Sequence, residues 1–110
     1  MKIKIDKNDI KPCNLNNIKA AGKEFKAAYT DGDLLNAYQR QTDDITNFGE
    51  VLRATVEVFE YSFDGSAGFM VELLTWNGLQ FHKIKFFVDA LLNVTVDNPL
   101  LITVDRYSRA

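Results

Sequence analysis

The Asn77-Gly78 pair restricts the fold of this chain more than any other local feature. It separates two runs rich in aromatic and aliphatic residues, 69–76 and 79–86. Both residues of the pair tolerate the positive φ that a two-residue type I′ turn requires, so the pair predicts a tight β-hairpin. A turn of two residues also predicts the register, in which Trp76 lies opposite Leu79.

This register predicts apolar side chains on both faces of the hairpin. One face carries Leu74 opposite Phe81 and an ion pair between Glu72 and Lys83. The other face carries the pairs Leu73 with His82, Val71 with Ile84 and Phe69 with Phe86. One covering layer cannot bury both faces. We therefore expect a central strand pair with helix on one face and another layer, a curled sheet or a partner on the other.

Before residue 50, the apolar residues recur at helical spacing. Residues 17–29 predict an amphipathic helix with lysines gathered on another face. We expect Asp31-Gly32 to end this helix, and Asp33 to cap a second one that continues to about Arg40.

After Gly49, β-branched and aromatic residues between turn signals predict strands. The alternation from Leu52 to Phe59 predicts a half-buried strand, and a last strand is expected over residues 100–107. A five-residue loop at 64–68 would place Glu60 opposite Glu72, so we expect a bulge or register shift there. The chain is therefore predicted to form a single α+β domain over residues 1–110. One or two N-terminal helices pack on a twisted antiparallel sheet of four to six strands, either open or partly closed into a barrel.

Composition excludes several classes of protein. With 46% hydrophobic and 25% charged residues in 110, the chain is typical of one compact domain and not of a disordered one. The single cysteine, Cys13, cannot form an internal disulfide, and the N-terminus lacks the apolar segment of a signal peptide. We therefore expect a cytoplasmic protein. No window has the roughly 18 apolar residues that a membrane span needs.

Residue types suited to catalysis or metal binding are scarce. His82 is the only histidine, and its place in a predicted strand favours a hydrogen-bonded structural role. One His and one Cys cannot form a zinc site, and no serine lies in a Gly-x-Ser-x-Gly turn. The sequence Asp31-Gly32-Asp33 begins like a calcium loop but has Leu35 at the fifth position. We expect neither enzymatic activity nor a metal or cofactor.

Charge is distributed unevenly along the chain. Residues 1–30 carry a net charge of +4, residues 31–72 of −7 and residues 73–110 of +1, within a total of −2. One interpretation is ordinary solvated faces. The other is a negative surface that orients a basic partner, with an exposed aromatic or aliphatic strand face as the buried anchor. The candidate residues of this acidic surface are Asp43, Asp44, Glu50 and Glu57.

These observations predict a non-enzymatic protein-binding module, a small inhibitor or regulator of mobile-element or phage type. Self-association through the same face, giving a homodimer, is a further possibility. The alternative is a protein that binds single-stranded nucleic acid by aromatic stacking on a sheet like that of oligonucleotide-binding barrels. Its candidate residues are Tyr61, Phe63, Trp76, Phe81, Lys83 and Lys85. A third class is a small-molecule-binding sheet with a helix-covered pocket.

Overall fold

The computed structural model describes residues 10–12, 16–61 and 67–107 of the chain. Cys13 and Phe63 lie outside these ranges. The elements follow one another as β1 (Ile10–Pro12), α1 (Asn16–Ala28), α2 (Asp31–Thr42), β2 (Glu50–Tyr61), β3 (Ala67–Trp76), β4 (Phe81–Val88), the 3-10 helix η2 (Pro99–Leu101) and β5 (Thr103–Tyr107).

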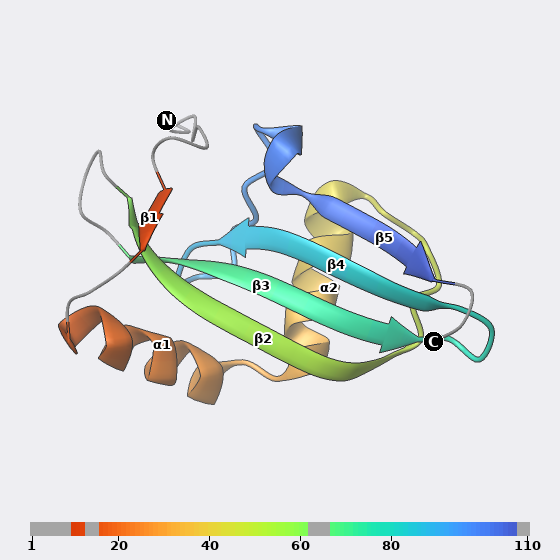
Figure 1. Cartoon of the computed structure of the whole chain (residues 1–110), viewed down its shortest axis with the longest axis horizontal. Helices are drawn as coiled ribbons and strands as arrows, with labels where there is room; N and C mark the ends of the chain where they lie inside the picture. The colour runs from red at the N-terminus through yellow and green to blue at the C-terminus, as the bar shows by residue number, and fades with distance from the viewer. Residues whose placement is uncertain (1–9, 13–15, 62–66, 108–110) are drawn as a thin grey trace.

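The strands form one antiparallel sheet in the order β1-β2-β3-β4-β5 (Figure 1). Each described strand pairs with its neighbour in sequence, and β1 and β5 lie at opposite edges. The predicted α+β fold is confirmed, with two helices on an antiparallel sheet. The sheet is not closed into a barrel, because its two edge strands do not pair with each other.

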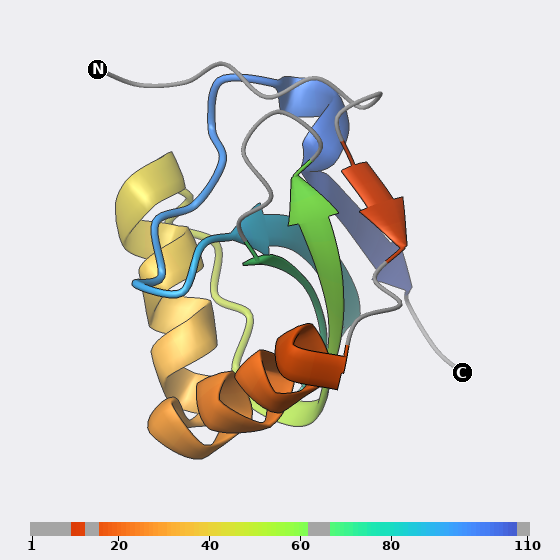
Figure 2. The same cartoon turned by 90° about the vertical axis from the view of Figure 1, so that its left-hand side faces the viewer.

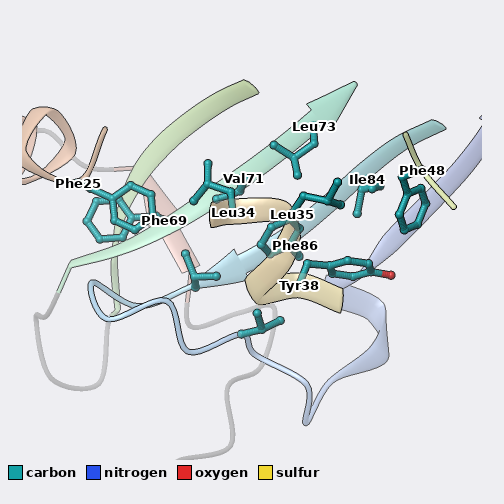
Figure 3. Packing of buried hydrophobic residues seen from close by; sticks show 12 residues of the cluster. Phe25, Leu34, Leu35, Tyr38, Phe48, Phe69, Val71, Leu73, Ile84 and Phe86 are labelled. Atoms are coloured by element: carbon teal, nitrogen blue, oxygen red, sulfur yellow. The ribbon is translucent and has the colours of Figure 1, made fainter. Parts of the chain in front are cut away.

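Both helices lie on the same side of the sheet, as Figure 2 shows. Their buried side chains meet every second residue of β3 and β4 and form the main core (Figure 3). Phe25 of α1 stacks on Phe69 of β3 with ring centroids 4.2 Å apart, and Tyr38 of α2 packs against Phe86 of β4 at 5.1 Å. On β3 and β4, this face of the sheet is therefore used in packing against the helices.

The first helix ends at Ala28, one residue before the predicted end. Asp31-Gly32 is not its stop, however, because these residues form the first turn of α2. Thr30 is the N-cap of α2. Its hydroxyl accepts from the Asp33 N–H at 3.1 Å, and the Asp33 carboxylate accepts from the Thr30 N–H at 2.9 Å. This reciprocal capping box satisfies two N–H groups at the helix start, so α2 begins two residues before the expected cap.

The predicted hairpin between β3 and β4 exists, but its turn lies one residue further along. Gly78 and Leu79 are the central residues, and of the two only Gly78 has positive φ, at 95°. That is the requirement of a type II′ turn. Asn77 closes the turn, since its side-chain oxygen accepts from the backbone N–H groups of Leu79 and Gln80, both at 2.8 Å.

The later turn moves every partner across the hairpin by two residues. Trp76 lies opposite Phe81 and not opposite Leu79. Because side chains alternate with a period of two, the predicted faces are nevertheless correct. The predicted ion pair also forms, between Lys83 Nζ and Glu72 Oε1 at 3.7 Å, although Lys85 is the residue directly opposite Glu72.

The irregularity expected near Glu60 lies instead at the other end of β2. Glu60 is opposite Ala67, so no two glutamates face each other there. The register shifts between Val51 and Arg53, and Leu52, the extra residue, is 46% exposed. The bulge therefore removes Leu52 from the apolar face that the alternation predicted.

The last strand is shorter than expected. Residues 99–101 form η2, which Asn98 caps by accepting from the Leu100 N–H at 3.0 Å, so β5 begins only at Thr103. Every residue of β5 is exposed, as befits an edge strand. Within the described residues, no helix is long and apolar enough to cross a membrane.

Candidate functional site

The side of the sheet opposite the helices is covered only in part. At one end, Leu101 of η2 packs with Phe59, Phe87 and Met70 in a small second core. Toward the β3–β4 turn, no described helix lies over this side. We call this region the open face, and its residues by register are Glu50, Arg53, Thr55, Glu57, Glu72, Leu74, Trp76, Phe81, Lys83, Lys85, Thr103, Asp105 and Tyr107.

An aromatic pair lies at the turn end of the open face. The rings of Trp76 and Phe81 are directly opposite across the hairpin, with centroids 4.4 Å apart and planes inclined by 38°. Both side chains are half-buried. Tyr107 of β5 lies opposite Phe81 and is 43% exposed, and half-buried Leu74 precedes Trp76 by two residues. We call Leu74, Trp76, Phe81 and Tyr107 the aromatic patch.

The charges of the open face alternate in sign around this patch. Its cations are Arg53, Lys83 and Lys85, and its acids are Glu50, Glu57, Glu72 and Asp105. Lys83 already pairs with Glu72, and Asp105 lies directly opposite it on β5. The face therefore carries no continuous basic strip, and acids outnumber cations by one.

Two of the four predicted acidic residues lie away from the open face, in the connection between α2 and β2. Asp43 is the left-handed C-cap of α2, with φ of 57°. Asp44 accepts hydrogen bonds from the Tyr38 hydroxyl at 2.8 Å, the Thr46 N–H at 3.0 Å and the Thr46 hydroxyl at 2.6 Å. Burial alone would raise the pKa of Asp44, but the bonds from Thr46 and Tyr38 outweigh it and hold the pKa below 3.8.

The other two predicted acids, Glu50 and Glu57, are exposed on the open face. Glu50 lies opposite Trp76, beside the aromatic patch, whereas Glu57 lies opposite Met70. Glu57 follows Glu50 by seven positions along the strand, or about 23 Å. The four carboxylates therefore form no single patch, and Glu50 is the one that the fold places next to the aromatic patch.

The residues of the nucleic-acid alternative are brought together more closely. Trp76, Phe81, Lys83 and Lys85 share the open face on two adjacent strands. Tyr61 is the last residue of β2, at the far end of the sheet from the hairpin turn, and Phe63 lies outside the described residues. The grouping supplies a stacking surface, but its lysines stand among acids.

His82 lies on the helix side of the sheet and is 1% exposed. Its ring meets the Phe48 ring edge to face, with centroids 5.0 Å apart. Burial, followed by the positive charge of Arg106, lowers the pKa of His82 below 6.5, against a smaller opposing effect of Asp44. Burial fits the expected structural role, whereas the expected hydrogen bond is missing at Nδ1, which has no partner among the described residues.

Two residues of β5 were not predicted from the sequence. Tyr107 lies on the open face, and Arg106 lies beside His82. Fourteen residues connect β4 to β5, and no turn rule predicts register across a connection of that length. The only available signal was the alternation of β5 itself, which separates Asp105 and Tyr107 from Arg106.

Within the described ranges, no group of three or more His, Cys, Asp or Glu side chains is placed to hold a metal ion. Comparison with protein-family models, curated proteins and solved structures finds no match to this chain.

Proposed function

We propose that this protein is a non-enzymatic, cytoplasmic protein-binding module, a small inhibitor or regulator, and that the open face is its interaction surface. The observation that carries the proposal is the Trp76–Phe81 pair, half-buried on a part of the sheet that no described helix covers. Trp and Tyr are enriched among the few residues that dominate binding energy at protein interfaces. The aromatic patch supplies one of each.

The energetic reason is that large rings in this position have apolar area left to bury. Each Trp or Phe side chain can bury about 150–250 Å² in all, and the folded chain leaves part of this area in water. A partner that covers the patch removes this remaining area from water. The rings already pack against each other and lose little side-chain freedom on binding, which lowers the entropic cost of association.

The occupant that we propose is a basic partner protein. Glu50 lies opposite Trp76, and Asp105 precedes Tyr107 by two residues on β5. The acids of the open face outnumber its cations by one, and the chain as a whole has a net charge of −2. Acids at the rim of an apolar patch accelerate the encounter with a positively charged surface and suppress wrong orientations. A partner with an apolar anchor between lysines or arginines fits this arrangement.

Charge argues against the nucleic-acid alternative. Binding to a phosphate backbone is dominated by lysines and arginines that neutralise phosphates. On the open face, Lys83 is paired with Glu72 and faces Asp105. Stacking on Trp76 and Phe81 would therefore bring a phosphate chain toward acids, so a protein partner is favoured.

The test uses the full chain as bait in a host lysate, followed by binding measurements with the purified partner that it retains. Trp76→Ala is expected to weaken this complex at least about 30-fold, as loss of a central interface aromatic does. Leu91→Ala is the control, since Leu91 is 77% exposed and lies on the connection after β4, outside the open face. Equal affinity of the two variants for the partner would refute the open face as the binding surface.

A second measurement examines the proposed charge of the partner. Glu50→Lys is expected to slow association and to reduce its dependence on salt, with a smaller change in dissociation. Glu24→Lys, an equal charge reversal at an exposed position of α1, serves as the control. Salt-sensitive quenching of Trp76 fluorescence by single-stranded oligonucleotides, or concentration-dependent self-association that Trp76→Ala abolishes, would overturn the assignment of a basic protein partner.

A further inference from the structure

A pocket of about 360 Å³ lies on the helix side of the sheet, at the edge formed by β5. Four separate parts of the chain line it. The connection between α2 and β2 contributes Thr46 and Asn47, and in Figure 1 this connection runs alongside β5. The hairpin contributes Asn77 and Gln80, β4 contributes His82, and β5 contributes Val104 and Arg106. Its volume is at the lower end of the range for small-molecule sites.

The walls of the pocket are fixed by hydrogen bonds between these segments. The Asn77 side-chain amide donates to the Asn47 carbonyl at 2.8 Å, which joins the hairpin to the α2–β2 connection. The Gln39 side-chain amide of α2 donates to the Thr46 carbonyl at 2.8 Å. The pocket is therefore held open by the fold itself, and a ligand would not have to order its walls.

His82 forms the buried floor of the pocket. His82 is only 1% exposed, and its Nδ1 has no hydrogen-bond partner among the described residues. A buried polar atom without a partner costs free energy and calls for a specific explanation, such as a ligand or water. Its lowered pKa keeps the ring neutral at neutral pH, with one N–H to donate.

Arg106 supplies a cation at the rim of the pocket. It lies directly opposite His82 across the β4–β5 pair, and it forms no ion pair with any residue in the described part of the chain. Among the described residues, no acidic side chain lines the pocket. The carboxylate of Asp44 acts on the pKa of His82, but its oxygens already accept three hydrogen bonds, from Tyr38 and Thr46.

We infer that this pocket binds a small carboxylate ligand, with the guanidinium of Arg106 pairing with the carboxylate and Gln80 and the ring of His82 completing the site. The planar fork of an arginine matches the geometry of a carboxylate and holds it by two parallel hydrogen bonds. The Gln80 side-chain amide is half-buried in the same wall and adds a neutral donor. The site is distinct from the open face, because Arg106 and His82 lie on the opposite side of the sheet.

The test is an NMR titration of the full chain with acetate, succinate and benzoate at constant ionic strength. Saturable shifts are expected in the Arg106 side-chain N–H and the His82 ring nitrogens. Arg106→Gln is expected to weaken the binding of the probe with the highest affinity about tenfold or more, as loss of a charged hydrogen-bond donor does. Gln80→Ala is expected to weaken the same probe by a smaller factor.

Arg53→Gln is the matched control, because it removes the same charge from an exposed arginine on the open face. It is expected to leave the affinity unchanged. Equal weakening by Arg53→Gln and Arg106→Gln would show general attraction to the surface and overturn the site. The site would also be overturned if chloride at the same concentration caused the same chemical-shift changes, or if the changes did not saturate with any of the three probes. Equal or tighter binding of inorganic phosphate would refute the assignment of a carboxylate.

Discussion

Gly49→Ala is expected to be among the most destabilising single changes outside the core. Gly49 has φ of 77°, in the left-handed region, where a residue with a Cβ costs about 1–2 kcal/mol. The added Cβ would also overlap the carbonyl group of Trp76 and lie 2.5 Å from the Cα of Asn77. Overpacking of this kind costs about 1–3 kcal/mol, so the free energy of unfolding should fall by about 2–5 kcal/mol.

Substitutions at two other glycines separate the cost of the positive φ from the cost of the overlap. Gly78 has φ of 95°, but an added Cβ would meet no atom within 4 Å, so Gly78→Ala should cost only the backbone term of about 1–2 kcal/mol. Gly32 lies in the first turn of α2, where a Cβ would make only an ordinary contact with Thr30 at 3.8 Å. Gly32→Ala should therefore stabilise the protein by about 0.5–1 kcal/mol.

The three variants are compared by urea unfolding, followed by Trp76 fluorescence and far-UV circular dichroism. A common m-value would show that each change acts on stability and not on the extent of unfolding. The expected order of stability, from most to least stable, is Gly32→Ala, wild type, Gly78→Ala, Gly49→Ala. Equal losses for Gly49→Ala and Gly78→Ala would refute the close approach of the α2–β2 connection to the hairpin, and with it the wall of the pocket.

Three further measurements examine the hydrogen bonds and buried groups near these elements. Thr30→Ala should lower stability by about 1 kcal/mol, and a double-mutant cycle with Asp33→Ala should show coupling between the two capping residues. Tyr38→Phe removes a 2.8 Å bond to the Asp44 carboxylate and should cost about 1–2 kcal/mol in chemical denaturation; no change would contradict that bond. Because burial lowers the folded-state pKa of His82, the unfolded chain binds the extra proton first, so stability should fall as pH drops below 6.5, by at most about 1.4 kcal/mol per pH unit. His82→Gln should lack this part of the pH dependence, and an unchanged profile in that variant would refute the assignment.

The faces of the central hairpin could be predicted from sequence, but the partners across it could not. Alternation alone places Leu73 toward the helices and Leu74 away from them, and this holds for any shift of the register by two residues. The position of the turn differs from the one that Asn-Gly typically takes, in which both residues are central. Here Asn77 lies before the two central residues, and its side chain accepts from the N–H groups of Leu79 and Gln80.

The helix start and the pocket were missed for different physical reasons. Thr30 and Asp33 have the spacing of a capping box, so the signal for α2 was present in the sequence but was weaker than the Asp31-Gly32 turn signal. The pocket has no sequence signal of its own. Its walls come from residues as distant as Thr46 and Arg106, and only the packing of the α2–β2 connection against β5 brings them together.

The pairing of β5 with β4 decides the composition of both proposed surfaces at once. In the observed register, Tyr107 lies opposite Phe81 and joins the aromatic patch, whereas Arg106 lies opposite His82 and reaches the pocket. A slip of one residue would exchange the two faces of β5 and remove Tyr107 and Arg106 from their places together. Val104 lies opposite Ile84 on the helix side, so the register that joins these two apolar residues also fixes the positions of the aromatic ring and the cation. The edge strand that the sequence constrained least is therefore the element on which both surfaces depend.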